Sequence, residues 1–466
     1  MSLIEDLRRQ AGDRGLFEQV KEYALEYMAT ISDRRVFPSE EALAGLQAFQ
    51  EAWPDEPTAP GEILELLHRV GSPATSAQTG GRYFGFVNGG VVPASLAAKW
   101  LADAWDQNAG LYVISPTASV LESVCEKWLV EMLGLPRGTG AGFVSGTSMA
   151  TFCGLAAGRD ELLRRQGWDA GARGLFGAPE IRVIVGAGAH STVYKALALL
   201  GLGRERLTVV PADDQGRMRA DLVPELDGRT LLVLQAGHVS TGAFDPFADI
   251  VGRARAAGAW VHVDGAFGLW ASASPRRRYL TAGADGADSW SADAHKTLNA
   301  PYDSGVIFCR DPELLARSMQ MAGSYIIYGE KRDGMLYTPE MSRRARAVEL
   351  WALLKALGRR GAAELVDGLC DQAALFAAGL RALGFSILNE VCFNQVLCAA
   401  ESPGITEKTL ALVQRSGECW CGGAAWRGAP AIRLSVCSFM TTREDIDRSL
   451  AAFAAAREKA RREDAA

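Results

Sequence analysis

Short apolar runs alternate with longer segments of helical periodicity through the middle of the chain, from about residue 82 to residue 320. The runs are rich in β-branched residues and predict strands, whereas an apolar residue at every third or fourth position predicts a helix. The predicted strands are 182–185, 207–210, 231–235, 260–264, 288–291 and 305–309, and the predicted helices are 149–166, 192–200, 246–257 and 312–321. This alternation builds βαβ units, so we expect an α/β fold with a mostly parallel sheet flanked by helices.

The first part of the chain, residues 1–75, shows helical spacing of its apolar positions but contains no predicted strand. Its apolar stripe therefore has no sheet of its own to cover, and such an arm usually packs on a partner subunit or on the main domain. A stretch rich in Gly, Ser, Thr and Ala over 71–81 predicts a hinge. We expect an N-terminal helical arm that takes part in dimerisation.

The last part of the chain follows a third pattern. It predicts two long helical segments that end near 383, strands near 387 and 396, a hairpin over 422–436 and a helix from 442. This mixture indicates a smaller α+β domain. The expected units are therefore the helical arm (1–75), a large domain (76–345) and a small C-terminal domain (346–466).

Composition narrows the function classes. With 48% hydrophobic and 22% charged residues, the 466-residue chain has the composition of a globular protein. Its net charge of −6 comes without a basic stripe, and no apolar run has membrane-spanning length, so we expect neither a nucleic acid nor a membrane as partner. The start of the chain lacks the apolar core of a secretion signal, which predicts a cytoplasmic protein. Nine scattered cysteines favour reduced thiols, and the pair Cys419 and Cys421 lacks enough neighbouring ligands to predict a metal site.

The strongest chemical signal is Lys296, which lies in a loop after a predicted strand, among small residues and directly after His295. A lysine in such surroundings can lose its proton and form an imine with a carbonyl compound. A solvated loop lysine is the alternative. Upstream, the strand 260–264 ends in Asp264, and a buried carboxylate needs a cationic partner. The protonated ring nitrogen of pyridoxal 5′-phosphate (PLP) would supply one, with a helix cap or a solvent-facing carboxylate as the alternative.

Two further segments fit the same cofactor. The residues 142–148 lead directly into a predicted helix, where small residues leave backbone N–H groups and hydroxyls free for a phosphate. His190 begins another helix after a strand, and its ring could lie flat on a cofactor ring; a capping or core role is the alternative. Together these four segments resemble the group II PLP-dependent amino acid decarboxylases, a family of fold type I, over nearly the whole chain.

The resemblance implies a PLP-dependent transferase fold with a mostly parallel seven-stranded sheet, an obligate homodimer, PLP as cofactor, and an amino acid carboxy-lyase activity. It also implies roles for individual residues. The catalytic residues are Lys296, His190 and Tyr337; the cofactor contacts, besides Lys296 and His190, are Gly146, Thr147, Ser148, Ser240, Asp264, Ala266, Ser291 and His295; the substrate contacts are Phe84, Asn88 and Asn108. Tyr337 is chosen over Tyr325 and Tyr328 as the family's loop tyrosine that protonates Cα of the substrate.

Four positions depart from the family pattern. His238 and Ser240 replace small polar residues such as Thr or Asn, and a histidine at 238 could reshape the site. Asp293 stands where some members have Asn, and an ionised carboxylate would be repelled by a phosphate, so we expect Asp293 to face another donor or to stand back from the anion. Met149 replaces an acidic residue that some members carry.

The substrate is an L-amino acid, and its side chain is harder to infer. A partly apolar pocket is expected from Tyr83, Phe84, Phe86, Val87, Leu111 and Tyr112, and no unpaired cation is evident, which favours an aromatic or apolar substrate. An aminotransferase and an oxidative aldehyde synthase of the same fold remain alternatives. A dinucleotide-dependent dehydrogenase is disfavoured because no Gly-x-Gly-x-x-Gly follows the first strand, and a non-catalytic PLP-fold protein is disfavoured because the reactive residues are present.

Overall fold

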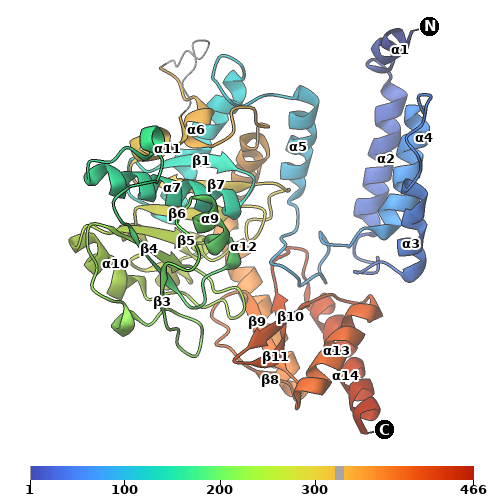
Figure 1. Ribbon diagram of the computed structural model, residues 1–466. Helices are drawn as coiled ribbons and strands as arrows, with labels where there is room; N and C mark the ends of the chain where they lie inside the picture. Colours follow the sequence, from blue (N-terminus) through green and yellow to red (C-terminus); the bar gives the residue numbers. More distant parts are fainter. Residues whose placement is uncertain (1, 321–329, 466) are drawn as a thin grey trace.

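The computed structural model describes residues 2–320 and 330–465 (Figure 1). A seven-stranded sheet lies at its centre, in the order β1-β7-β6-β5-β4-β2-β3. Its strands are β1 (Gly140–Val144), β2 (Arg182–Gly186), β3 (Leu207–Val210), β4 (Thr230–Gln235), β5 (Trp260–Asp264), β6 (Ser289–Asp293) and β7 (Gly305–Cys309). All neighbours pair in parallel except β7, which is antiparallel to both β1 and β6. The predicted α/β fold with a mostly parallel seven-stranded sheet is confirmed.

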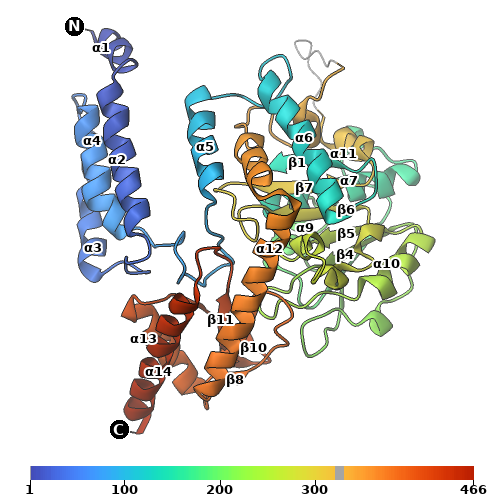
Figure 2. The ribbon, with the colours of Figure 1, turned by 180° about the vertical axis from the view of Figure 1, so that it is seen from behind.

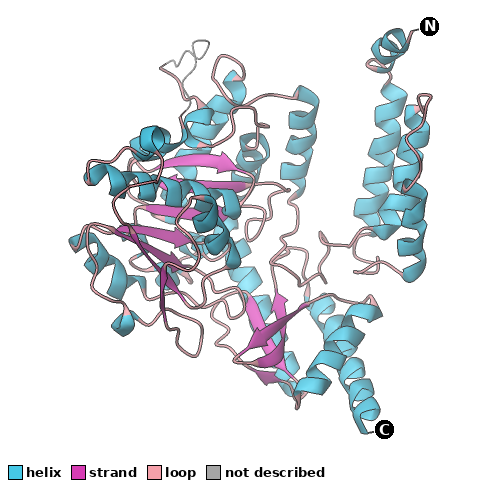
Figure 3. Ribbon diagram, viewed as in Figure 1, coloured by secondary structure: helices cyan, strands magenta, loops and turns pink. Residues whose placement is uncertain are grey.

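Strand β1 was not predicted, because two of its five residues are glycines and the segment has little β-propensity of its own. Helices cover both faces of the sheet (Figure 3). They are α5 (Pro93–Trp105), α6 (Pro116–Leu133), α7 (Thr147–Arg165), α8 (Ala170–Arg173), α9 (Ser191–Leu199), α10 (Phe247–Ala256) and α11 (Pro312–Met319). None of the helices in the described part of the chain combines the length and the apolar character that crossing a bilayer requires.

The core lies in two layers because side chains alternate along each strand. On β4, Leu232 and Leu234 pack with residues of α6, α10 and the first turns of α12 (Ala347–Ala382). Leu231 and Val233 point to the opposite face and pack with α7, α9 and α11. The sheet is thus buried on both faces, as its near-continuous apolar strands require.

A four-stranded antiparallel sheet forms the smaller unit, in the order β10-β11-β9-β8. Its elements are β8 (Ser386–Ile387), β9 (Gln395–Ala399), α13 (Pro403–Ser416), β10 (Gly422–Trp426), β11 (Ala429–Ser435) and α14 (Arg443–Ala465). Helix α12 joins the two sheets: Leu350 belongs to the large core and Phe376 to the small one. The helix kinks between them at Gly358, where φ is 59°, a value that favours glycine.

The N-terminal segment consists of α1 (Leu3–Gln10), α2 (Arg14–Thr30), α3 (Glu40–Gly45) and α4 (Pro60–Leu66). In both views it lies away from the seven-stranded sheet (Figures 1 and 2). No residue of α2 is buried, and Phe17 on that helix is 62% exposed. The expected helical arm is therefore present, and its apolar stripe is uncovered in the single chain.

Candidate active site

A cavity of about 540 Å³ lies at the carboxyl ends of β4, β5 and β6. In open α/β sheets this edge is where ligands bind, because loops rather than paired strands line it. Eight of the predicted site residues line the cavity: Gly146, Thr147, Ser148, His190, Asp264, Ala266, His295 and Lys296. The structure thus brings together residues from four separate segments of the chain.

Lys296 lies in the tight turn that follows β6. The turn is closed by backbone hydrogen bonds, including one of 2.9 Å from the N–H of Ala294 to the carbonyl of Ser304. The Nζ atom of Lys296 forms an ion pair of 3.0 Å with Oδ2 of Asp293, the last residue of β6. The lysine side chain is 22% exposed and the aspartate side chain 4%. The amine is therefore held at the cavity wall by a buried carboxylate.

Asp264 ends β5, where its backbone pairs with Gln235 on one side and with Ser291 on the other. Its Oδ1 accepts a hydrogen bond of 3.2 Å from the N–H of Ala266. Burial raises the pKa of Asp264, and the charges of His190 and Lys296 oppose that rise. A buried carboxylate with so few donors favours a cationic ligand group, as the ring nitrogen of PLP provides.

His190 caps the N-terminus of α9 and lines the cavity as well. Its Nδ1 accepts a hydrogen bond of 3.3 Å from the N–H of Thr192, which leaves the ring proton on Nε2 in the neutral tautomer. Burial lowers the pKa of His190, although the carboxylate of Asp264 partly offsets this. The capping role and a place beside a cofactor ring are thus both compatible with its position.

The segment predicted to bind phosphate, which we call the phosphate loop (145–148), joins β1 to the first turn of α7. The hydroxyl of Thr147 is buried and has no hydrogen-bond partner among the described residues. A Cβ atom on Gly146 would lie 3.3 Å from both Oδ1 of Asp293 and the ring of His295, so glycine keeps this corner of the cavity open. A free hydroxyl, a helix N-terminus and a missing side chain fit the phosphate of PLP. The residues present therefore fit this cofactor.

Other predicted site residues lie outside the cavity. Ser291 is buried beneath it and shares a contact of 2.9 Å between its hydroxyl and that of Thr151. Ser240 donates its backbone N–H to Nδ1 of His238 over 3.2 Å. Neither residue lines the cavity. The hydroxyl of Ser291 is engaged within the protein, and the predicted contacts of both residues to the cofactor stay predictions.

The three residues predicted to contact the substrate make other contacts within the protein, and the prediction for Phe84 has to be corrected. Phe84 is fully buried in the core of the small domain, edge-on to Phe376 with ring centroids 5.0 Å apart. Asn88 accepts a hydrogen bond of 2.9 Å from the hydroxyl of Tyr302. Asn108 accepts one of 3.1 Å from the N–H of Gly110. The cavity is instead lined by Phe86, two positions beyond Phe84.

Tyr337, the predicted proton donor, does not line the cavity either. It ends a 3₁₀ turn (Gly334–Tyr337), and the guanidinium carbon of Arg332 lies 4.6 Å from the centroid of its ring. This cation–π contact helps to hold the ring of Tyr337 in its position, and the sequence pattern does not reveal it. In the single chain its position therefore does not support the predicted role. The alternatives Tyr325 and Tyr328 lie outside the described residues.

Arg433 is a cavity residue that was not predicted, and its presence corrects the expectation that the pocket lacks an unpaired cation. It lies on β11 between two core residues, Ile432 and Leu434, so the strand alternation turns it toward the cavity. Its Nη1 donates to the carbonyl of Val239 over 3.3 Å, and its Nε has no partner among the described residues. Burial lowers the pKa of Arg433. The sequence signal that could have indicated Arg433 is an arginine between two apolar residues of a predicted strand.

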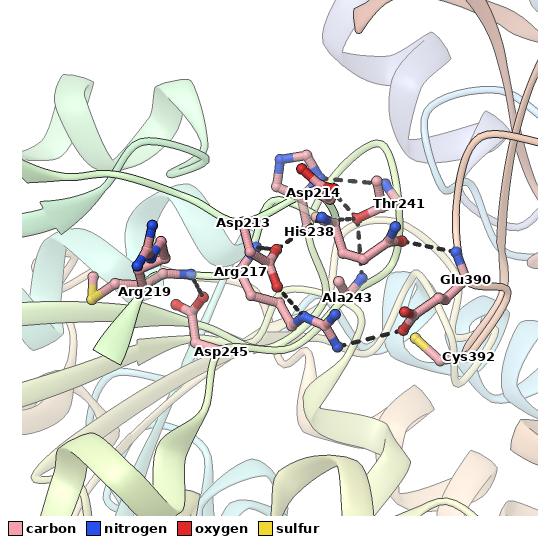
Figure 4. Close-up of polar contacts among 12 residues, drawn as sticks. Asp213, Asp214, Arg217, Arg219, His238, Thr241, Ala243, Asp245, Glu390 and Cys392 are labelled. Atoms are coloured by element: carbon pink, nitrogen blue, oxygen red, sulfur yellow. Dashed lines mark hydrogen bonds and ion pairs between the residues drawn. The ribbon is translucent and has the colours of Figure 1, made fainter. Parts of the chain in front are cut away.

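His238 holds the loop between β4 and α10 in place. Its Nδ1 accepts hydrogen bonds from the N–H groups of Ser240 and Thr241, at 3.2 and 3.3 Å, as an asparagine side chain does in an Asx turn. Figure 4 shows Arg217, from a neighbouring turn, reaching the small domain, where its Nη1 forms an ion pair of 3.4 Å with Glu390. Burial lowers the pKa of His238 to about 4. The histidine therefore serves as a neutral structural acceptor behind the cavity.

Comparisons with known proteins agree with this site. The model of the pyridoxal-dependent decarboxylase conserved domain matches residues 44–399. Tryptophan decarboxylase 1 of Oryza sativa subsp. japonica is 27% identical over 372 residues, 74% of this chain and 71% of the relative. Cysteine sulfinic acid decarboxylase of Mus musculus is 30% identical over 301 residues, 61% of this chain and 60% of the relative. Parts of both relatives thus lie outside the match.

A solved structure of Oryza sativa TDC with PLP and tryptamine has the same fold. It superposes with a TM-score of 0.87 at 21% sequence identity and covers 96% of this chain and 97% of that one. The family match spans most of the chain, from the arm to the small domain, and includes every cavity residue from Phe86 to Lys296. The chain belongs to the pyridoxal-dependent decarboxylase family, and PLP is its cofactor.

Proposed function

We propose that the chain removes carbon dioxide from an L-amino acid and releases the corresponding amine, with PLP held at Lys296. The observation that carries the proposal is the convergence of Lys296, Asp264 and His190 on one cavity. When bound, PLP supplies an electron sink for the pair of electrons that carbon dioxide leaves at Cα. Asp264 would keep the proton on the ring nitrogen, and the phosphate loop from Gly146 to Ser148 would anchor the phosphate.

An aromatic or apolar side chain is the first substrate class that we propose. Phe86 lines the cavity, and its ring stacks on Trp420 with centroids 5.4 Å apart. Trp420 stacks in turn on Tyr83 at 5.2 Å. This stack offers an apolar wall for a planar substrate side chain. A relative named for tryptophan is consistent with such a substrate.

An acidic side chain is the second candidate, and Arg433 is the observation that favours it. A guanidinium at the cavity wall that has no carboxylate partner among the described residues can bind a carboxylate or sulfinate through charge-assisted hydrogen bonds. Relatives named for acidic amino acids and for cysteine sulfinic acid are consistent with this substrate class. The two candidates predict losses of different size when the arginine is removed.

An amine-release screen tests the proposal and separates the candidates. Wild type and Arg433→Met are each given tryptophan, phenylalanine, glutamate, aspartate and cysteine sulfinate, and carbon dioxide, amine, aldehyde and peroxide are measured. For an acidic substrate, kcat/KM should fall by roughly 10-fold or more in Arg433→Met, since hydrogen bonds to charged groups contribute about 1.5–3 kcal/mol. An aromatic substrate should lose far less. Aldehyde with peroxide in place of amine would instead identify the oxidative alternative.

We also propose a homodimer, formed through the arm. Leu3, Phe17 and Val20 are each more than 40% exposed, and burying such side chains contributes about 1.5–3 kcal/mol apiece. Sedimentation should therefore find a dimer of the full chain. A fully active monomer would contradict the proposal.

We also propose that the protein works in the reducing environment of the cytoplasm. All nine cysteines are free thiols, and eight of them are buried. Burial raises the pKa of Cys419 and Cys421, so their thiolates are scarce and slow to oxidise. Localisation of a tagged full-length chain would test this.

A further inference from the structure

Asp293 lies between the phosphate loop and the reactive lysine. Its Oδ1 accepts a hydrogen bond of 2.6 Å from the N–H of Thr147, the first residue of α7. Its Oδ2 is 3.0 Å from Nζ of Lys296. Nε2 of His295 lies 3.6 Å from Oδ1. One carboxylate thus contacts both the group that would bind phosphate and the group that would bind the carbonyl of PLP.

This position creates a conflict of charge. The backbone N–H groups at the start of α7 form a natural anion site, and Asp293 already takes one of them. A phosphate that enters the loop meets this carboxylate, and two anions in direct contact cannot both stay ionised without a large cost. The same carboxylate is the counter-ion of the Lys296 amine, and an amine must give up its extra proton before it can attack a carbonyl carbon. A single proton transfer would relieve both problems.

We propose that Asp293 is the proton acceptor for Lys296 and that arrival of the phosphate group drives the transfer. The proton moves from Nζ to Oδ2 along the existing contact, so an ammonium and a carboxylate become an amine and a carboxylic acid. The net charge of the pair is unchanged, and no proton is exchanged with solvent. The new O–H then donates to the phosphate, and the lone pair on Nζ becomes free to attack a carbonyl carbon. Recognition of phosphate is thereby coupled to activation of the nucleophile.

The surroundings of the pair favour Asp293 over other acceptors. Among the described residues, Asp293 provides the one ion-pair contact recorded for Nζ of Lys296. Asp264 also faces the cavity but accepts a hydrogen bond from the N–H of Ala266, and it forms no direct ion pair with any residue that the structure describes. Burial lowers the pKa of His190 and of His295, which makes each a weaker proton acceptor. The inference rests on the proposed attachment of PLP at Lys296.

The test uses pyridoxal, which has the reactive aldehyde of the cofactor but no phosphate. The full-length chain is freed of PLP and incubated with pyridoxal, with or without inorganic phosphate. Borohydride reduction and peptide mapping then measure the rate of pyridoxyl incorporation at Lys296. Sulfate is run in parallel, because it carries the same charge but is too weak a base to remove the proton itself. We expect either anion to accelerate incorporation in wild type by about tenfold, the effect of one unit of proton affinity.

Asp293→Asn should remove the dependence on the added anion, because the amide is neither a counter-ion nor a base. Asp293→Ser, which keeps an acceptor for the N–H of Thr147, should behave in the same way and serves if the first variant folds poorly. Inorganic phosphate alone should bind both variants more tightly than wild type, by calorimetry. Asp285→Asn is the matched control, because Asp285 is exposed and lies outside the cavity, and it should keep the acceleration.

Two results would overturn the inference: a wild-type rate that neither anion changes, or a variant at Asp293 that keeps the full acceleration. Failure of the proposed attachment would look different. In that case PLP itself would leave no pyridoxyl group on Lys296 in wild type after reduction.

Discussion

Two groups of buried charges in this chain are built in opposite ways. In the first, which we call the α6 cluster, Arg332 and Arg343 face Glu122 and Glu126 on helix α6. Arg343 pairs with Glu122 at 2.6 Å, and Arg332 pairs with Glu126 at 2.7 Å. In the cavity, by contrast, Arg433 faces no carboxylate among the described residues.

The pKa shifts of Arg332 and Arg433 show this difference between the two groups. Burial lowers the pKa of Arg332, but the charges of Glu122 and Glu126 outweigh burial and leave the pKa raised. Burial lowers the pKa of Arg433, and no charge compensates. Buried charges are costly unless they are paired, so a cavity that keeps unpaired charges does so at the expense of stability. We conclude that the α6 cluster holds the fold, whereas the charge of Arg433 in the cavity has no carboxylate partner among the described residues and stays available to a ligand.

The largest effect expected from this comparison is on stability, in the α6 cluster. Glu122→Ala leaves Arg343 with an uncompensated buried charge, while Arg332 keeps Glu126, and should lower the free energy of unfolding by about 3–5 kcal/mol. Glu131→Ala, on the same helix, removes an exposed partner of Arg359 and should cost only about 0–1 kcal/mol. Urea unfolding of both variants measures the difference. Equal losses would remove the distinction between the two kinds of ion pair.

A slightly smaller effect should depend on pH. Because the pKa of His238 is about 4 in the fold and 6.5 in the unfolded chain, the unfolded chain binds the proton first as the pH falls. Stability is therefore complete above about pH 6.5 and is lost progressively toward pH 4, by about 3 kcal/mol in total. His238→Asn keeps an acceptor for Ser240 and Thr241 but does not titrate, so its loss between pH 6.5 and 4 should be smaller. Equal losses in the free energy of unfolding of the two proteins between pH 6.5 and 4 would show that protonation of His238 is not coupled to unfolding.

Asp264→Asn should have the smallest effect on stability and a clear effect on turnover. Burial raises the pKa of Asp264, which means that its ionised form is destabilised in the fold, so the amide should leave the unfolding midpoint unchanged or raise it. Turnover should fall on the order of a hundredfold, as is typical when one preorganised electrostatic group is removed. Steady-state kinetics and urea unfolding of the same preparation measure both. A variant that unfolds more readily but keeps full turnover would place Asp264 with the α6 cluster.

The sequence predicted the parts of this site that local pattern determines. Lys296, Asp264 and His190 each follow a strand within a short motif, and the α/β alternation places such strand ends at one edge of the sheet. Phe84 and Phe86 could not be told apart, because φ of Phe86 is 51° and the chain leaves the extended conformation between them. Arg433 depends on a contact with a distant segment, at Val239, and Tyr337 depends on Arg332, which Glu122 and Glu126 of helix α6 hold in place. No local pattern encodes those contacts.

The central claim is that the cavity is built around a PLP-bearing Lys296. The most direct test is to purify the full chain with PLP, reduce it with borohydride and map the labelled peptide. We predict a single pyridoxyl group on Lys296, and its absence in Lys296→Ala without loss of folding. A pyridoxyl group on any other lysine of the wild-type chain would contradict the account.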